Sequence, residues 1–447
     1  MKQLLHNATI TDANDSFKGW LLISDGIIEA IGCGDAPARL IDDETVSVTD
    51  CEGDIIMPGV IDTHVHFRDP GLTDKGDIAS ESRAAVAGGV TSYIDMPNTK
   101  PATTTIKAWN EKMSRAADVS VANYAFFLGA TNDNLDELLA ADYSRVPGIK
   151  MFLGSSTGNM LVDNDDMLSR LFAQSPAVIA VHAEDEATIK ANRATIASRY
   201  PQGEVPIELH SVLRDRTACY KSSKHAVDMA RRHGARLHLL HISTLEELEL
   251  LEPGDTATKR ITAETCPHYL IFNEGEYLAK GARVKCNPAI KADTDRQALL
   301  RAVKEGLVDT IATDHAPHLP AHKEGDLFTA ASGMPGVQFS LPVMLSLGID
   351  MRTVSRLMSG NPAALYGIAG RGYIKEGFAA DLVRVKTLDT SVAITDNDVI
   401  SKCGWTPYDG TRVNHRVITT WVNGGIAFDN GTLSDRSYAT PLSFEHN

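Results

Sequence analysis

Two histidines separated by one residue, His64 and His66, carry the strongest chemical signal in this chain of 447 residues. The residues just before them, 58–63, are mostly apolar and β-prone, and side chains alternate along a strand with a period of two. Both imidazoles should therefore point the same way from a strand end and could clamp a divalent metal ion. Arg68 follows on the same side, and its planar guanidinium can hold a carboxylate through two hydrogen bonds. This pattern predicts an enzyme that acts on a small acid; the alternative is a pair of histidines satisfied in the core or on the surface.

The elements that would position these residues form a regular series. Apolar strands alternate with helical patterns, such as 77–87 and 293–305, from Pro58 onward. We expect eight strands, most of them about 30 residues apart, which fits a (β/α)8 barrel with its active site at the carboxyl ends of the strands. The alternative is an open, doubly wound sheet. The expected strands are 58–67, 91–96, 121–127, 148–152, 178–182, 236–241, 261–265 and 310–313.

The two ends of the chain have a different texture, with short strands and turns. The Asp25-Gly26 pair lies between two apolar runs and is a strong hairpin signal. After about residue 370 the same texture returns. We therefore predict a small β-sandwich-like domain from residues 1–55 and 370–447, and a barrel from residues 56–369. Between the fifth and sixth strands we expect an excursion followed by a helix from about Leu209 to His233.

Further candidate metal ligands fall at or near the carboxyl ends of the expected strands. A single histidine at such a position is usually packed or hydrogen-bonded, but several at one rim of a barrel favour a metal site. Imidazole and carboxylate ligands suit zinc, with manganese or cobalt as substitutes. The candidates are His64, His66, Lys150, His182, His241 and Asp314.

Lys150 needs a separate explanation, because a protonated ammonium would be repelled by two divalent cations. A neutral lysine can react with carbon dioxide to give a carbamate, which is an anionic ligand with two oxygens. The alternative is a lysine paired with a nearby acid. Residues 151–156 contain no acid.

Composition narrows the classes of partner. The hydrophobic content of 43% and charged content of 23% are ordinary for a soluble globular protein. The formal net charge of −15 argues against a nucleic-acid or anionic-membrane partner but permits an anionic substrate. The six cysteines form no CxxC pair, which is typical of a reducing compartment. Residues 1–7 lack the apolar core of a signal peptide, and no apolar run is long enough to span a membrane, so we expect a cytoplasmic protein.

These motifs together resemble the dihydroorotases of the amidohydrolase superfamily, and more broadly the cyclic amidohydrolase group, which includes hydantoinases and allantoinases. The resemblance covers essentially the whole chain, and Arg68 and Asn98 carry its narrower, dihydroorotase part. The matching segments are His64-Val65-His66-Phe67-Arg68-Asp69-Pro70-Gly71, Asp95-Met96-Pro97-Asn98-Thr99, Lys150, His182-Ala183-Glu184, His241-Ile242-Ser243 and Thr313-Asp314-His315-Ala316-Pro317-His318.

The resemblance implies a centre of two zinc ions. One ion would be held by His64, His66 and Asp314. The other would be held by His182 and His241, with a carbamylated Lys150 as a bridging ligand. Asp314 would also be the catalytic acid and base.

The resemblance also implies the substrate contacts. Arg68, Asn98 and His318 would hold a carboxylate, while Asn287 and the Ser332-Gly333 segment would contact the ring. Two positions depart from the family pattern. The usual Asn-Pro-Pro-Leu-Arg is Asn-Pro-Ala-Ile-Lys after residue 286, and Ser332 stands where an aromatic residue is often found.

The implied activity is the reversible hydrolysis of dihydroorotate to N-carbamoyl-L-aspartate, a step of pyrimidine synthesis. The substrate is thus a small molecule, and the resemblance leads us to expect a homodimer. Two alternatives stay open. One is an allantoinase or a hydantoinase, and the other is a non-catalytic scaffold on the same fold. The six candidate ligands speak against the scaffold.

Overall fold

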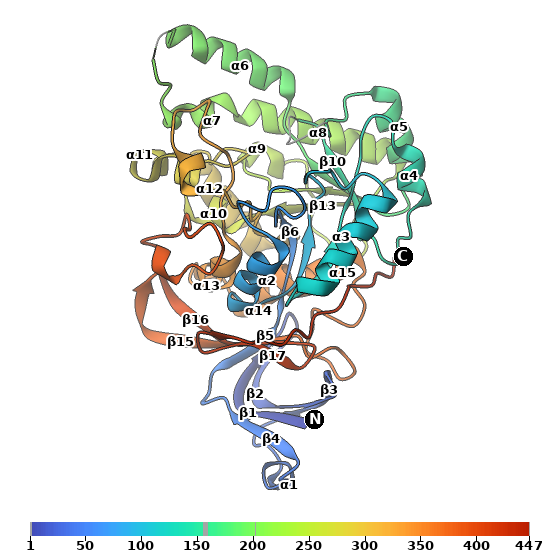
Figure 1. The fold of residues 1–447 in the computed structure, drawn as a ribbon, viewed down its shortest axis with the longest axis vertical. Coiled ribbons are helices and arrows are strands. Elements are labelled where there is room, and N and C mark those ends of the chain that lie inside the picture. Colours follow the sequence, from blue (N-terminus) through green and yellow to red (C-terminus); the bar gives the residue numbers. More distant parts are fainter. Residues whose placement is uncertain (1, 155–159, 202, 447) are drawn as a thin grey trace.

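All eight expected barrel strands are present in the computed structural model, which describes residues 2–154, 160–201 and 203–446. Helices surround them in the upper part of the molecule (Figure 1). The strands are β6 (Val60–Val65), β7 (Val90–Asp95), β8 (Asn123–Phe126), β10 (Gly148–Phe152), β11 (Val178–His182), β12 (Leu237–Leu239), β13 (Ile261–Thr265) and β14 (Thr310–Ile311), with a short β9 (Leu128–Gly129) after β8.

Backbone hydrogen bonds close these strands into a ring. One parallel sheet has the order β14-β13-β12-β11-β10-β9, and the other has the order β6-β7-β8. β8 and β9 are separated by a single residue, Phe127, whose N–H donates to the carbonyl of Asp95. At the other junction the N–H of His66 donates to the carbonyl of His315 over 2.7 Å. The predicted barrel is therefore confirmed, and the open sheet is excluded.

The helices between the strands begin at side-chain caps in several places. Asp77 accepts a hydrogen bond from the N–H of Ser80 at the start of α2, as an N-cap residue does. The predicted helices 77–87 and 293–305 correspond to α2 and α12. The α-helices are α1 (Ala38–Ile41), α2 (Ile78–Ala87), α3 (Ile106–Val119), α4 (Leu135–Ala140), α5 (Asp165–Gln174), α6 (Glu186–Arg199), α7 (His210–Leu213), α8 (Arg216–His233), α9 (Leu245–Leu248), α10 (Pro267–Ile271), α11 (Glu276–Lys280), α12 (Asp293–Glu305), α13 (Ser340–Leu345), α14 (Met351–Ser355) and α15 (Asn361–Tyr366).

The excursion after the fifth barrel strand differs from the prediction. A single helix from Leu209 to His233 is wrong, because the chain breaks it into α7 and α8. The break lies at Arg214 and Asp215, where the Asp215 side chain accepts from the N–H of Ala218 and so starts a new helix. The excursion also contains α6. This helix forms the end of the molecule farthest from the sheet that the two ends of the chain build, here called the chain-end sheet (Figure 1).

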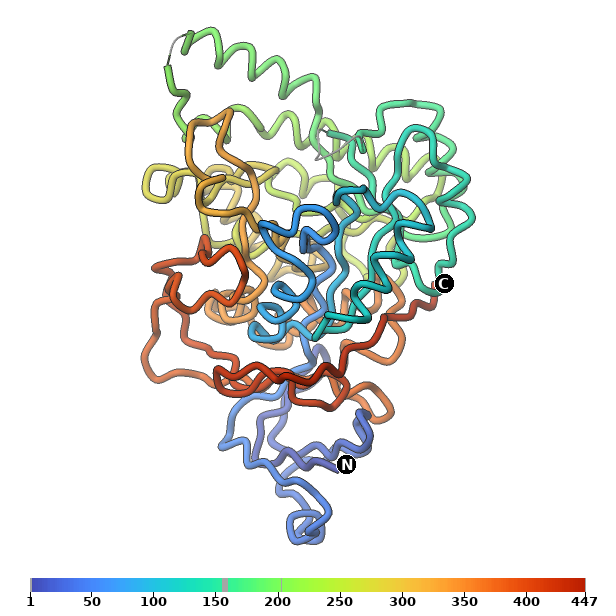
Figure 2. The backbone as a smooth tube through the Cα atoms, viewed as in Figure 1, coloured from blue at the N-terminus to red at the C-terminus, as the bar shows by residue number. Residues whose placement is uncertain are grey.

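The two chain ends form one nine-stranded sheet, which places the first and last parts of the sequence side by side (Figure 2). β5 pairs with β1 on one side and with β15 on the other, so it joins the two halves. The Asp25-Gly26 turn joins β2 and β3 with positive φ angles of 50° and 86°, which confirms the predicted hairpin. The strands are β1 (Lys2–Thr11), β2 (Ser16–Ser24), β3 (Ile27–Cys33), β4 (Val46–Asp50), β5 (Ile55–Pro58), β15 (Leu382–Ala393), β16 (Arg412–Val422), β17 (Gly425–Asp429) and β18 (Thr432–Leu433).

After β18 the chain runs back along the barrel, as the red segment of Figure 2 shows. The N–H of Tyr124 in β8 donates to the carbonyl of Thr440, and the N–H of Leu442 donates to the carbonyl of Tyr124. The last residues thus add backbone contacts to the barrel rather than to the chain-end sheet. The domain boundaries at residues 55 and 370 stay a prediction.

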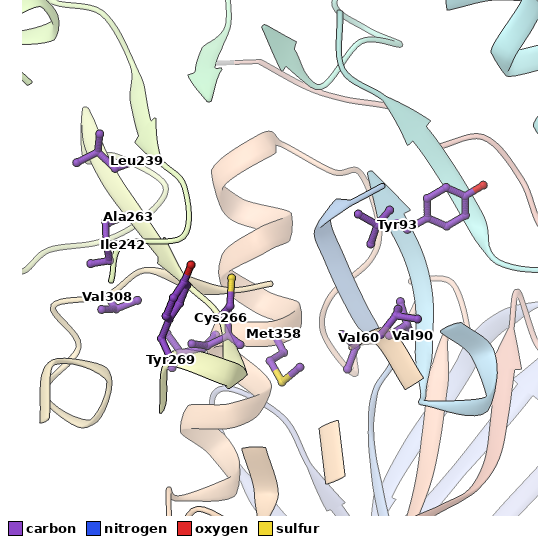
Figure 3. Close-up of a cluster of buried hydrophobic side chains, with 14 of the residues drawn as sticks. Val60, Val90, Tyr93, Leu239, Ile242, Ala263, Cys266, Tyr269, Val308 and Met358 are labelled. Atoms are coloured by element: carbon purple, nitrogen blue, oxygen red, sulfur yellow. The ribbon is translucent and has the colours of Figure 1, made fainter. Parts of the chain in front are cut away.

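The main hydrophobic core supports the barrel. Strand side chains such as Leu239 of β12 and Ala263 of β13 are buried against helical residues such as Tyr269 (Figure 3). Across the same view lie Val60 and Val90, from β6 and β7. Burial of this kind is the dominant favourable contribution to folding and fixes the strand ends in place.

Two further features of the described residues bear on the predicted setting. No helix among residues 2–154, 160–201 and 203–446 is long and apolar enough to cross a membrane. All six cysteines are free thiols, and only Cys33 is exposed.

Candidate active site

A cavity of about 480 Å³ opens at the carboxyl ends of the barrel strands and contains every site residue expected from the sequence. This position is where (β/α)8 enzymes carry their active sites. The expected residues that line it are His64, His66, Arg68, Asn98, Lys150, His182, His241, Asn287, Asp314, His318, Ser332 and Gly333.

The first group of expected ligands meets at Asp314. Its Oδ1 atom lies 3.2 Å from Nε2 of His64 and 3.0 Å from Nε2 of His66. One ligand atom from each of the three buried residues lies within 4.8 Å of the others. Burial lowers the pKa of His66 to about 4, so this imidazole is neutral. Although burial opposes ionisation of Asp314, the neighbouring His64 and His66 hold its pKa below the ordinary value.

The second group consists of His182 at the end of β11 and His241 just after β12. Nδ1 of His182 lies 2.9 Å from Nε2 of His241. Burial lowers the pKa of both imidazoles, so both are neutral at physiological pH. The ring centre of His241 is 5.3 Å from that of His64, so the two groups adjoin.

Three of these histidines are oriented by an acceptor on the far side of the ring. Nδ1 of His64 lies 2.8 Å from Oε1 of Glu264, and Nδ1 of His66 lies 2.8 Å from Oδ1 of Asn98. Because a carboxylate or amide oxygen can only accept, the far nitrogen must donate, and in the neutral imidazole the near nitrogen then keeps its lone pair.

His182 follows the same rule with the opposite nitrogen. Its Nε2 lies 3.0 Å from Oε2 of Glu184, and Glu184 also accepts a hydrogen bond from Arg214. Sequence reasoning missed Glu184, Glu264 and Arg214 as supporting residues. The only signal for Glu184 was its place two residues after His182, whereas Glu264 and Arg214 are distant in sequence.

Lys150 lies in β10 with its side chain fully buried in the cavity wall. Within the described part of the chain its Nζ has no hydrogen-bond partner and no ion pair, so the expected alternative of a pairing acid is not found there. Burial lowers the pKa of Lys150 to about 7, which makes the neutral amine accessible. Residues 155 and 156, which belong to the acid-free segment after Lys150, lie outside the described residues.

The donor set therefore fits divalent metal ions. The four expected histidine ligands, one aspartate and one buried amine without a hydrogen-bond partner in the described part of the chain line a single cavity. Imidazole nitrogens with free lone pairs and carboxylate oxygens are ligands that bind zinc in proteins, and other divalent first-row metals can occupy such sites.

Three site residues have backbone conformations that side chains rarely adopt. The φ angles of Arg68, His241 and Asp314 are 68°, 40° and 48°. Such residues cost about 1–3 kcal/mol each and cluster at functional sites, where the surrounding structure holds them. Three of the eight non-glycine residues with positive φ in the described part of the chain are thus residues that the sequence marks for chemistry.

Arg68 contributes a positive charge to the lining of the cavity. Its Nη2 donates to Nε2 of His318 over 3.2 Å and its Nε donates to the carbonyl of Pro317. Arg68 is buried, and among the described residues it forms no ion pair with a carboxylate. Burial lowers its pKa only to about 10, so it stays charged at neutral pH. A buried cation without an ion-paired carboxylate is costly, and an anionic ligand would reduce that cost.

The rest of the cavity lining extends this positive character. Arg193, Arg214 and Lys285 line the cavity, and Asp314 is the one carboxylate among the described lining residues. The excess of positive charge contrasts with the net charge of −15 for the whole chain. The cavity is therefore suited to a negatively charged ligand.

The expected ring contacts, Asn287, Ser332 and Gly333, line the same cavity. Oδ1 of Asn287 is buried without a partner in the described part of the chain. Gly333 has φ of 135°, and a Cβ there would lie 2.7 Å from the carbonyl oxygen of Ala316 and 2.9 Å from the ring of His318. Only glycine fits this approach to His318.

A (β/α)8 barrel whose carboxyl-end cavity brings together the four expected histidine ligands, an aspartate and a buried lysine has a donor set that suits a metal-dependent hydrolase. Comparison with known proteins identifies the family. Residues 55–427 match the model of the amidohydrolase family, and the chain belongs to it.

Named relatives cover most of the chain. It is 35% identical over 386 residues to a dihydroorotase of Halobacterium salinarum, spanning 85% of this chain and 87% of that protein. It is 30% identical over 421 residues to an allantoinase of Bacillus velezensis, spanning 92% and 90%. The structure of L-hydantoinase from Arthrobacter aurescens superposes with a TM-score of 0.91 at 26% identity and covers 99% of both chains. The resemblance to dihydroorotases and their cyclic amidohydrolase relatives is thus confirmed, and the relatives do not agree on one substrate.

Proposed function

We propose that this protein is a dihydroorotase, which reversibly hydrolyses dihydroorotate to N-carbamoyl-L-aspartate. The observation that carries the proposal is the buried guanidinium of Arg68, which lacks a carboxylate partner among the described residues. Dihydroorotate supplies one carboxylate on its ring. Its pairing with Arg68, in a cavity already rich in positive charge, satisfies both groups.

The metal centre that we propose holds two zinc ions. His64, His66 and Asp314 would bind one ion, and His182 and His241 would bind the other. Lys150, as a carbamate, would bridge them. This role accounts for the burial of its Nζ without a hydrogen-bond partner in the described part of the chain. When bound, the ions lower the pKa of water and polarise the amide carbonyl of the substrate.

The residues of the chain would then perform positioning and proton transfer. Arg68, with Asn98 and His318, holds the carboxylate so that the scissile amide faces Asp314. Asp314 accepts a proton from the attacking water as the new C–O bond forms. It returns this proton to the ring nitrogen as the C–N bond breaks, which opens the ring and leaves that nitrogen as the NH2 of the carbamoyl group. In synthesis the same residue removes the proton from the carbamoyl nitrogen.

Asn98 would have two tasks in this proposal. Its Oδ1 accepts from Nδ1 of His66, so only its amide N–H groups are left to donate to a carboxylate. We propose that Asn98 links the metal side of the cavity to the anion side. Asn287, Ser332 and Gly333 are proposed to contact the ring.

The alternatives make different demands on the cavity. Hydantoin and allantoin lack a carboxylate on the ring, so either would leave Arg68 buried and unpaired. A non-catalytic scaffold would have no need for six converging ligands or for strained backbone at His241 and Asp314. We also propose a cytoplasmic location, in keeping with the free cysteines, and a homodimer.

The proposal is tested by replacing Arg68 with methionine. Arg68→Met should lower kcat/KM for dihydroorotate by about 30-fold or more, because losing one member of a buried charge pair costs about 2–5 kcal/mol. Hydrolysis of hydantoin, if measurable, should not fall, and bound metal should be unchanged. Arg384→Met is the matched control, since Arg384 is a partly buried arginine that pairs with Asp54 in the chain-end sheet. A variant at Arg68 that handles dihydroorotate as the parent does would contradict the assignment.

A further inference from the structure

One segment forms much of the cavity wall without contributing an expected metal ligand. Residues 327–333, here called the pocket loop, all line the cavity, and they include the proposed ring contacts Ser332 and Gly333. A loop in this place must be held firmly if its backbone is to meet a small ring at a fixed distance.

Lys323 holds the end of the pocket loop. Its buried Nζ donates to three carbonyl oxygens, those of Ala331 at 2.7 Å, Gly333 at 2.8 Å and Lys285 at 3.1 Å. An ammonium group has three N–H donors, so all three are used and all point at backbone. The carbonyls of Ala331 and Gly333 flank the proposed contact Ser332 on both sides.

Lys285 holds the start of the same loop. Its buried Nζ donates to the carbonyl of Leu327 over 2.7 Å and also to that of Ala330. The backbone of Lys285 is part of the arrangement as well, because its carbonyl accepts from the N–H of Gly333 over 2.9 Å. Two lysines thus tie the loop at four of its seven carbonyls.

Neither lysine is placed as a simple structural ion pair would be. In the described part of the chain, Lys285 and Lys323 have only carbonyl oxygens as hydrogen-bond partners, although an ammonium in the interior is costly. Lys259, by contrast, pairs with the carboxylate of Asp309. Because the partners are carbonyl oxygens of the pocket loop, the position of the loop backbone depends on the two ammonium groups, and their positions depend on the loop.

We propose that Lys285 and Lys323 form a clip that positions the pocket loop against the substrate ring and thereby sets the affinity for it. Both are positioning residues, since they act through the backbone around Ser332 and Gly333. The identity of the ring rests on the proposed function, whereas the clip itself does not.

The test combines a measurement without substrate and one with it. In Lys323→Met, hydrogen–deuterium exchange in the pocket loop should become at least about tenfold faster, because the carbonyls of Ala331 and Gly333 lose their ammonium donor. KM should rise by about tenfold or more while kcat changes by less than about threefold. Lys259→Met is the matched control: it removes a partly buried lysine that lies just before β13, outside the cavity lining, and should leave exchange in the loop and KM unchanged.

Two outcomes would overturn the clip: loop exchange and KM equal to the parent in Lys323→Met, or a fall in kcat with no change in KM. If Lys323→Met does not fold, loop exchange is measured in Lys285→Met, which removes two bonds to the loop; KM is not used for this variant, because Lys285 itself lines the cavity. Failure of the proposed function is distinguishable, because the exchange measurement uses no substrate. KM can also be measured with whichever cyclic amide the parent enzyme hydrolyses.

Discussion

At the scale of single residues, the ring nitrogens that face away from the cavity centre decide what the histidines can do. Glu264, Asn98 and Glu184 accept from the far nitrogens of His64, His66 and His182. Each acceptor fixes one tautomer and points a lone pair at the cavity. Within the described residues Nδ1 of His241 has no such partner, and this ring is positioned by its strained backbone and its neighbours.

The metal centre predicts that binding and turnover fail together. His182→Ala or His241→Ala should each lower bound metal, measured by elemental analysis of the purified protein, and should lower activity in proportion. His225→Ala, which changes a histidine of α8 outside the cavity, serves as the control. Full metal content with normal turnover in both variants would remove them from the ligand set.

Lys150 gives a second prediction at this scale. Lys150→Ala should be nearly inactive, because the bridging oxygens of a carbamate would be lost. Short carboxylic acids added to the variant should restore part of the activity by supplying two oxygens to the same position. The chemical state can be read directly by high-resolution crystallography. A plain amine next to two fully occupied metal sites would refute the carbamate.

At the scale of elements, the regular features of the sequence were sufficient for the barrel. Apolar strands separated by helical patterns predicted all eight strands, because periodicity follows directly from which face is buried. The helix expected at 209–233 failed for a local reason. Asp215 caps α8 and ends the continuity, and apolar periodicity does not reveal such a cap inside a longer helical pattern.

The candidate site was predictable only where chemistry is written in a short motif. Histidines, Lys150, Arg68 and Asp314 stand out by type and by place at strand ends. Lys323 and Lys285 do not, because two lysines 38 positions apart carry no sign that both reach one loop. Contacts between distant segments depend on the closed ring and on how the loops cross it.

The clip predicts a dependence of substrate affinity on pH. Burial lowers the pKa of Lys323 to about 7; Lys285 and Arg68 also lower it, while Cys286 opposes them. The ammonium is fully present below this pKa and is lost as pH rises through it, which leaves two N–H donors for three carbonyls. KM of the parent enzyme should therefore rise between about pH 7 and about pH 9, and this rise should be smaller in Lys323→Met, where only Lys285, whose pKa burial lowers to about 8, is left to titrate in the clip. An identical pH profile of KM in both proteins would contradict it.

At the scale of the whole molecule, charge is distributed unevenly. The chain has a net charge of −15, yet Arg68, Arg193, Arg214 and Lys285 line one cavity. An acidic exterior disfavours polyanionic partners, while a local positive cavity attracts a small anion. The fold separates the charges in this way because it brings four cations that are distant in sequence to one cavity.

The most direct test of the central claim is a comparison of kcat/KM for dihydroorotate, hydantoin and allantoin with the purified, metal-loaded parent enzyme. The consumption of dihydroorotate can be followed by ultraviolet absorbance. A site built to pair with a substrate carboxylate rejects analogues that lack it, so we expect dihydroorotate to be preferred by at least about 100-fold. Turnover of hydantoin or allantoin at an equal or higher kcat/KM would contradict the assignment and leave a cyclic amidohydrolase with a different substrate.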